Sequence, residues 1–374
     1  MRRLSANYIF PVTSNPIKNG IVEVDDQGVI SKVIDTKGKP TEISKLEFYN
    51  GILVPGFVVP YCRMEPFPNN KLITNTANNI EGNHQEMAEE QLLSFNINQF
   101  NHLEENLKDT GVKGAGVVLN QMSLLPNIVE SSICIHPFIE VKNGTDQDSF
   151  TSFSRALNKV MIAWNEFKVH SSIIPVDISK EPDVTEHLIN YAWNHFNPMF
   201  IQSSDKSIPA DQILELLIRS LIRWSGDHEN DVLNNFNNAV IIPYHRFTQV
   251  KYRKSPGLYF LISSSVEEYL NVPSYNESEL SEYSDMVVIS GYGLGFKPCF
   301  SMLNDIRLLQ DQYPGIALEK WFCCSCLNGA RAIGMEKELG SFEPGKSPGI
   351  NLITNVDFDN MMLTEKSEVR VMIK

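Results

Sequence analysis

The stretch Gly51-Ile-Leu-Val-Pro-Gly-Phe57 divides this chain of 374 residues into two parts with different patterns of predicted secondary structure, and so decides its fold. Before it, segments rich in β-branched and aromatic residues predict short strands at 5–10, 20–24 and 29–34. Asp25-Asp-Gln-Gly28 separates the last two segments and is typical of a hairpin turn. The quoted stretch is itself largely apolar and contains a Pro-Gly pair, a strong structure breaker. The sequence therefore predicts a small β-rich unit that stops at this pair.

After residue 57, apolar runs of strand length alternate with longer amphipathic stretches. The strand candidates lie at 114–119, 133–139, 171–174, 199–201, 239–242, 257–262 and 286–289. The helix candidates lie at 150–167, 183–195, 210–224, 266–270 and 302–312. Buried strands that alternate with helices are typical of a parallel sheet with helical cover. About eight such units favour a (β/α)8 barrel over an open sheet.

Two further regions depart from this alternation. The polar, Asn-rich segment 69–106 is interpreted as a long insertion that becomes helical from residue 86. Toward the end of the chain, 318–334 predicts an amphipathic helix that stops at a glycine. A turn-rich link follows at 339–346, and short strands are expected at 350–354 and 369–373.

Charge and composition exclude several classes of protein. The formal net charge is −13 and the pI is near 5.1, a poor match for the phosphate backbone of nucleic acids. The first residues include two arginines but lack the apolar stretch of a signal peptide. No run of ~18 apolar residues could span a membrane. We expect a cytoplasmic protein with reduced thiols that binds neither nucleic acid nor membranes.

The two ends of the chain together resemble one family. Residues 5–56 resemble the N-terminal β-segment of the amidohydrolase superfamily, and residues 318–354 resemble its closing helix and link. The resemblance is closest to the aminohydrolase branch, which includes the guanine, adenosylhomocysteine and aminofutalosine deaminases. It implies an α/β protein with a distorted, TIM-like (β/α)8 barrel at 57–337. A small composite β-sandwich domain is then built from 1–56 and 338–374.

The resemblance also implies a metal site. In that branch a His-x-His pair on the first barrel strand, two histidines from strands in mid-barrel and an aspartate from the last strand bind one metal ion, usually zinc or iron. The third histidine belongs to a His-x-x-Glu pattern. The metal lowers the pKa of a bound water, which attacks a ring carbon that carries an amine or a halide.

This chain has other residues at each of those positions. Tyr61 and Arg63 stand at the His-x-His pair, and a guanidinium has no lone pair with which to bind a cation. Gln202 stands at the third histidine and Asp205 at the glutamate. The fourth histidine, the aspartate and a histidine that often contacts substrate are replaced, in that order, by Tyr244, Tyr292 and Val176.

Two functional hypotheses follow. The first is an amidohydrolase-like pseudoenzyme whose metal-dependent hydrolase or deaminase site is lost, with no metal or other cofactor. Its former ligand positions then form a polar pocket for a small ligand, or the protein binds a second copy of itself or an active paralogue. The second is an active, divergent hydrolase of non-peptide C–N bonds in a heterocycle, for which zinc or iron is expected. Its candidate catalytic residues are Asp205, His245, Asp177 and Glu65.

Several of these residues also have a structural interpretation. Arg63 could form a buried ion pair with Asp205 or Glu65 and fill the space of the metal. His245 is the one histidine on a predicted barrel strand that could face the mouth of the barrel. His136 is interpreted as a histidine at the end of a strand whose hydrogen bonds are satisfied by its neighbours.

The cysteines and a glycine-rich segment are interpreted as structural as well. Cys323, Cys324 and Cys326 fit small buried hydrophobic residues better than zinc ligands, because no second ligand pair is visible. The segment 291–295 lacks the Gly spacing of a dinucleotide-binding loop and is expected to form a tight turn.

Overall fold

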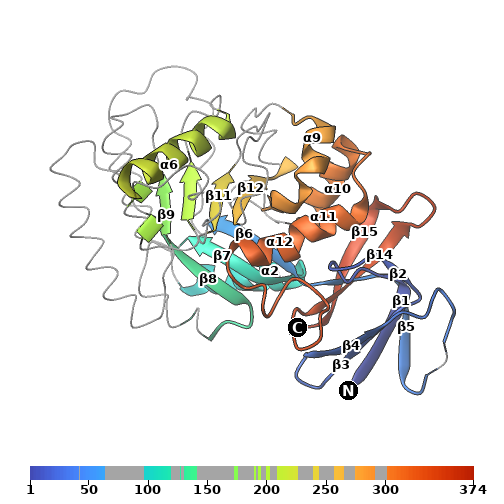
Figure 1. Ribbon diagram of the computed structural model, residues 1–374. Coiled ribbons are helices and arrows are strands. Elements are labelled where there is room, and N and C mark those ends of the chain that lie inside the picture. Colours follow the sequence, from blue (N-terminus) through green and yellow to red (C-terminus); the bar gives the residue numbers. More distant parts are fainter. Residues whose placement is uncertain are drawn as a thin grey trace.

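The structure is a computed structural model of the chain (Figure 1). It describes residues 1–41, 43–63, 97–118, 127, 130–140, 172–175, 189–190, 193–194, 199–202, 209–225, 239–243, 257–264, 274–290 and 301–374. The described strands form two sheets, one of seven strands and one of eight. Within these ranges, no helix has both the length and the apolar character needed to cross a membrane.

Both ends of the chain build the seven-stranded sheet. Its strands are β1 (Arg2–Ile9), β2 (Ile17–Lys18), β3 (Ile21–Val24), β4 (Ile30–Ile34), β5 (Leu46–Pro55), β14 (Ile350–Asp357) and β15 (Met362–Ile373). They lie in the order β15-β14-β5-β1-β3-β4, with β2 paired to β1. Strand β5 is parallel to β1 and antiparallel to β14, so it joins the early strands to the late ones. Figure 1 shows the blue and red strands side by side.

The hairpin of β3 and β4 forms as its turn sequence predicts. Asp25 Oδ1 accepts hydrogen bonds from the backbone N–H groups of Gln27 (2.8 Å) and Val29 (2.9 Å), and Gly28 has a φ of +83°. The predicted β-sandwich is not confirmed, because the strands of both chain ends form one continuous sheet. The apolar face of that sheet packs against Phe342, which comes from the link after the closing helix.

The eight-stranded sheet is entirely parallel. Its strands are β6 (Phe57–Arg63), β7 (Val112–Val118), β8 (Cys134–Glu140), β9 (Ser172–Pro175), β10 (Met199–Gln202), β11 (Val240–Pro243), β12 (Leu258–Ile262) and β13 (Val287–Ile289). Neighbours in the sequence are neighbours in the sheet, from β6 to β13. The seven strands predicted between 114 and 289 agree with β7 to β13 to within two residues at each end. The strand predicted at 369–373 is the last part of the longer β15.

The prediction of a (β/α)8 barrel is confirmed in part. Eight parallel strands in sequential order are the strand arrangement of that architecture. No backbone ladder joins the first strand, β6, to the last, β13, among the described residues. The two edges nevertheless approach each other, because the Ser290 hydroxyl just after β13 donates a hydrogen bond to the carbonyl of Tyr61 in β6.

Helices cover the outer face of this sheet (Figure 1). The described helices of six residues or more are α2 (Ile97–Asp109), α6 (Ala210–Ser225), α9 (Glu277–Glu282), α10 (Met302–Gln312), α11 (Leu318–Ser325) and α12 (Leu327–Ala332). The helix predicted at 318–334 is thus two helices, since Cys326 (φ −119°, ψ −78°) interrupts the regular backbone. Residues 97–106 of the predicted insertion belong to α2, and 69–96 lie outside the described residues. So do the helices predicted at 150–167 and 266–270 and most of 183–195.

Alternation along β6 separates an outer core from an inner one. Phe57 and Val59 point to the outer cluster, where α2, α6, α10 and α11 pack. Val58 points to the inner cluster, which also contains inward side chains of β8, β11, β12 and β13. The register with β7 shifts between Val59 and Cys62, and beyond this shift Tyr61 joins the inner cluster and Cys62 the outer one. Residues of α12 and the link behind it, such as Leu339, close the inner cluster at the amino-terminal ends of the strands.

Gly51, the first residue of the stretch 51–57, is important for the stability of the fold. This residue has a φ of +152°, and a Cβ built on it would lie 2.3 Å from the carbonyl oxygen of Ile353 in the adjacent strand. Gly51→Ala should therefore lower the free energy of unfolding by about 3 kcal/mol, through steric overlap and backbone strain. Urea denaturation followed by circular dichroism measures the loss.

Gly334 provides the matched control. Its φ is +70°, and an added Cβ would meet no heavy atom within 4 Å. Gly334→Ala should cost only the left-handed backbone penalty of about 1 kcal/mol. Equal losses in the two variants would show that the close approach at Gly51 is unimportant.

Candidate functional site

The candidate site lies at the carboxyl-terminal ends of the parallel strands, where ligands of such sheets bind. Arg63 is the last residue of β6 and Gln202 the last residue of β10. For these two residues the structure describes the backbone alone, and Arg63 pairs with Val118 of β7. Seven more predicted site residues lie outside the described residues; they are Glu65, Val176, Asp177, Asp205, Tyr244, His245 and Tyr292. The proposed ion pairs of Arg63 and the turn at 291–295 stay predictions for the same reason.

Tyr61 is the predicted site residue whose side chain the structure describes. It is 1% exposed and packs into the inner cluster with Phe138 of β8. The strand between β6 and β8, β7, carries Gly116 where the Phe138 ring and the backbone before Tyr61 come close. A Cβ at Gly116 would lie 2.4 Å from the ring of Phe138 and 2.3 Å from the carbonyl oxygen of Pro60. The Gly-Ala-Gly sequence of β7 therefore allows large aromatic side chains from β6 and β8 to share the interior.

Hydrogen bonds from side chains hold the first and last strands together. Ser290 is fully buried and donates to the Tyr61 carbonyl, a contact between residues 229 positions apart. The Asn328 amide in α12 donates to the carbonyls of Ser284 (2.9 Å) and Val287 (2.8 Å). The Ser290 contact ties the strand that carries Tyr61 to the residue after β13, and the Asn328 contacts tie α12 to the start of β13 and the turn before it. The sequence analysis missed both residues, although Asn328 belongs to the closing-helix passage that carries the family resemblance.

His136 lies on the inner face of β8 rather than at a strand end. The ring centroids of His136 and Phe138 are 5.0 Å apart, and the two rings are tilted by 48°. Burial lowers the pKa of His136 to about 4, so the imidazole is neutral at neutral pH. A neutral imidazole can donate one hydrogen bond and accept another. His136 thus adds a polar group to an otherwise largely apolar interior.

A buried carboxylate lies near the carboxyl-terminal end of β12. Asp305 of α10 is 2% exposed, and its Oδ2 accepts a hydrogen bond from the Ser263 hydroxyl at 2.8 Å. Ser263 follows directly after β12 and is itself fully buried. Buried carboxylates require such partners because desolvation disfavours the charge. The sequence analysis missed Asp305, whose only signal is an acidic residue on the apolar face of an amphipathic helix.

The three clustered cysteines are buried thiols, as predicted. Cys324 and Cys326 are buried and Cys323 is partly so, and burial raises the pKa of all three, to about 11 for Cys323. The Cys326 thiol donates to the carbonyl of Pro55 at 3.6 Å, and the Cys324 thiol to that of Ser284 at 3.4 Å. No group of three or more potential metal ligands occurs in the part of the chain that the structure describes.

The last part of the chain matches one known protein family. Residues 282–373, which include β13, α10 to α12 and the last two strands, match the amidohydrolase family. The match covers about a quarter of the chain. For the closing helix and link at 318–354, this match confirms the predicted resemblance to the amidohydrolase superfamily. No curated protein sequence matches the chain.

Solved structures of deaminases resemble the amidohydrolase-like chain over nearly its whole length. Aminofutalosine deaminase of Helicobacter pylori is 14% identical with a TM-score of 0.62, over 97% of this chain and 94% of its own. Guanine deaminase of E. coli is 14% identical with a TM-score of 0.61, over 94% and 88%. An adenosine deaminase of Xanthomonas campestris with bound zinc is 12% identical with a TM-score of 0.59, over 97% and 87%. At these identities the likeness shows the fold alone.

Removing the Ser290 hydroxyl should loosen the contact between the first and last strands. Ser290→Ala leaves the buried Tyr61 carbonyl without this donor and should lower the free energy of unfolding by about 2 kcal/mol. Backbone amides of β6 should also exchange faster in hydrogen–deuterium exchange. The matched control is Ser220→Ala in α6, where an equally buried hydroxyl donates within its own helix to the carbonyl of Leu216. That loss should be small, and equal effects of the two variants would contradict the role of Ser290.

The pKa of His136 predicts a dependence of stability on pH. The unfolded chain binds a proton at His136 below pH 6.5, whereas the folded chain does so only below about pH 4. The unfolded state holds more protons between these values, so the free energy of unfolding falls as the pH drops through this window. The contribution of His136 is at most about 3 kcal/mol.

The comparison of two glutamine variants measures this contribution. His136→Gln should flatten the slope of unfolding free energy between pH 6.5 and 4 relative to the unmodified chain. His102→Gln, at an exposed position of α2, is the control and should leave the slope unchanged. An unchanged slope in His136→Gln would contradict a buried neutral imidazole.

Proposed function

We propose that this amidohydrolase-like protein binds a small polar ligand, of the nitrogen-heterocycle class, at the carboxyl-terminal ends of its parallel strands without a catalytic metal. The observation that carries the proposal is Tyr61. At the position of the first metal-binding histidine, a tyrosine side chain fills the interior and packs against Phe138. A phenol is not among the imidazole and carboxylate groups that bind zinc or iron in amidohydrolase-like sites.

The chemistry of the neighbouring residues supports the same conclusion. Arg63 carries a permanent positive charge and has no lone pair to offer a cation. Gln202 and the tyrosines at 244 and 292 are neutral, polar groups suited to hydrogen bonds with a ligand. This set of donors does not fit zinc or iron, which imidazole and carboxylate ligands bind in amidohydrolase-like sites. A homodimer or an active paralogue as partner stays a proposal of the same kind.

The second candidate is an active hydrolase of non-peptide C–N bonds in a heterocyclic substrate. The comparisons favour this candidate, because the solved structures with this fold include adenosine, guanine and aminofutalosine deaminases. Its acid–base residues are Asp205, His245, Asp177 and Glu65. In this case the metal, when bound, would supply an activated water, which the candidate residues would have to orient and deprotonate.

Metal content and ammonia release separate the two candidates. Protein purified without a chelator should contain zinc and iron well below one ion per chain. It should release no ammonia from purines, pyrimidines or triazines. Stoichiometric metal, together with ammonia release that Asp205→Ala abolishes, would overturn the metal-free proposal in favour of the hydrolase.

Ligand binding is tested with a matched pair of arginine variants. Heterocycles from the same screen that raise the melting temperature of the unmodified protein should lose at least about tenfold in affinity in Arg63→Ala. Arg331→Ala, at an exposed position of α12 near the amino-terminal ends of the strands, should bind them normally. Equal affinities in the two variants would place the ligand elsewhere.

A further inference from the structure

A shallow groove lies where the seven-stranded sheet meets the amino-terminal ends of the barrel strands. Its walls come from the turn between α2 and β7, the residues before β8, and the ends of β14 and β15. Three lysines line it, at positions 108, 113 and 374. The groove is therefore separate from the ligand site proposed above, which lies at the carboxyl-terminal ends of the strands.

Lys113, the second residue of β7, supplies an ammonium without an ionic partner. Its stem lies against two glycines, since a Cβ at Gly56 would be 2.5 Å from Lys113 Cβ and one at Gly349 would be 3.6 Å from Cγ and Cδ. Lys113 Nζ lies 3.5 Å from the carbonyl oxygen of Ser132, and Lys113 forms no ion pair with any described residue. An ammonium has three donors, so most of its hydrogen-bonding capacity is unused.

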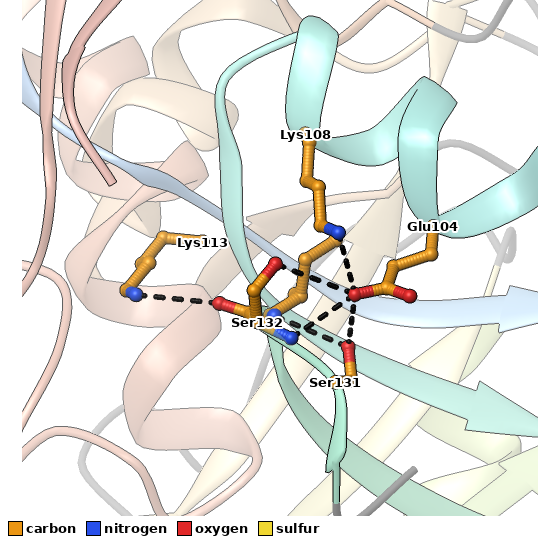
Figure 2. A network of polar contacts seen from close by, with 6 residues as sticks. Glu104, Lys108, Lys113, Ser131 and Ser132 are labelled. Atoms are coloured by element: carbon orange, nitrogen blue, oxygen red, sulfur yellow. Dashed lines mark hydrogen bonds and ion pairs between the residues drawn. The ribbon is translucent and has the colours of Figure 1, made fainter. Parts of the chain in front are cut away.

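The second lysine, Lys108, is already neutralised at the rim of the groove (Figure 2). Lys108 Nζ lies 2.7 Å from Glu104 Oε1, and the same oxygen accepts hydrogen bonds from the Ser131 hydroxyl (2.8 Å) and the Ser132 backbone N–H (3.0 Å). Burial opposes ionisation of Glu104, but these donors hold the pKa of the carboxyl below its ordinary value. The network fixes the strand-end residues beside Lys113 and leaves the charge of Lys113 unbalanced.

Asn351 of β14 adds a buried amide to the same groove. The residue is 1% exposed, and its Nδ2 donates to the carbonyl of Gly111 at 2.8 Å. A Cβ at Gly111 would lie 2.6 Å from this nitrogen, so the glycine permits the close contact. An amide nitrogen carries two N–H donors, so the Asn351 side chain has one more donor than this bond uses.

We propose that the groove binds a small oxyanion, such as a phosphate group or a carboxylate, between the Lys113 ammonium and the Asn351 amide. A groove lined by both a cation and a neutral donor offers an oxyanion charge-assisted and neutral hydrogen bonds together. The net charge of −13 repels anions from the protein as a whole, so binding depends on this local arrangement. The anion would bridge the seven-stranded sheet, through β14, and the parallel sheet, through β7.

Inorganic phosphate is the probe for the first experiment. The full-length protein is titrated with phosphate by isothermal calorimetry, with sodium chloride keeping the ionic strength constant. Saturable binding is expected, accompanied by a rise in melting temperature that follows the logarithm of phosphate concentration above the dissociation constant. Acetate as competitor separates the two sources: displacement of phosphate supports a carboxylate ligand, and no displacement supports a phosphate ligand.

Two charge-matched variants decide whether Lys113 forms the site. Lys113→Met keeps the apolar stem between the glycines, removes the charge and should weaken phosphate binding at least about tenfold. Lys113→Arg should stay within a few-fold of the unmodified protein, which shows that the groove is intact. Lys337→Met removes the same charge at an exposed position outside the groove and should bind phosphate normally. Equal weakening in both methionine variants, or stabilisation by phosphate that never saturates, would overturn the proposal.

Discussion

At the junction of β5 with β6 the backbone lies in close contact with two other backbone segments, α12 and the residues just before β14, and the arrangement of both sheets depends on these contacts. The chain passes from one sheet to the other through Pro55 and Gly56, with no loop between them. The Gly56 N–H donates to the carbonyl of Pro348 at 3.0 Å, and a Cβ at Gly329 would lie 2.5 Å from the carbonyl oxygen of Val58. Because backbone meets backbone here, side chains larger than hydrogen have no space at either glycine. The relative position of the sheets is therefore fixed sterically.

This constraint also explains how the interior is organised. Packing of α12 against β6 places small residues such as Ala330 below the inner cluster, which closes the amino-terminal ends of the strands. The same strand then carries Tyr61 inward and receives the Ser290 hydroxyl on its carbonyl. The candidate ligand site is thus held by contacts from two elements far away in the sequence.

The sequence predicted the parallel strands well, because each is a short apolar run between polar segments and needs no knowledge of its neighbours. It failed where long-range geometry decides. Cys326, which interrupts the predicted closing helix, contacts Pro55 in another element through its thiol, and the single terminal sheet depends on β5 pairing with both β1 and β14. Of the candidate site, the inward direction of Tyr61 follows from the resemblance, whereas Ser290 and Asp305 acquire their roles only through partners 42 or more residues away.

The position of β5 between early and late strands has a consequence for biosynthesis. One edge of β5 pairs with β1, but the other edge stays unpaired until β14 is synthesised, about three hundred residues later. During that interval an apolar strand presents unpaired N–H and C=O groups, the kind of edge on which other chains can add. Completion of this sheet is therefore a late, non-local step of folding, and slow synthesis or truncation before β14 would expose the nascent chain to aggregation and to chaperones.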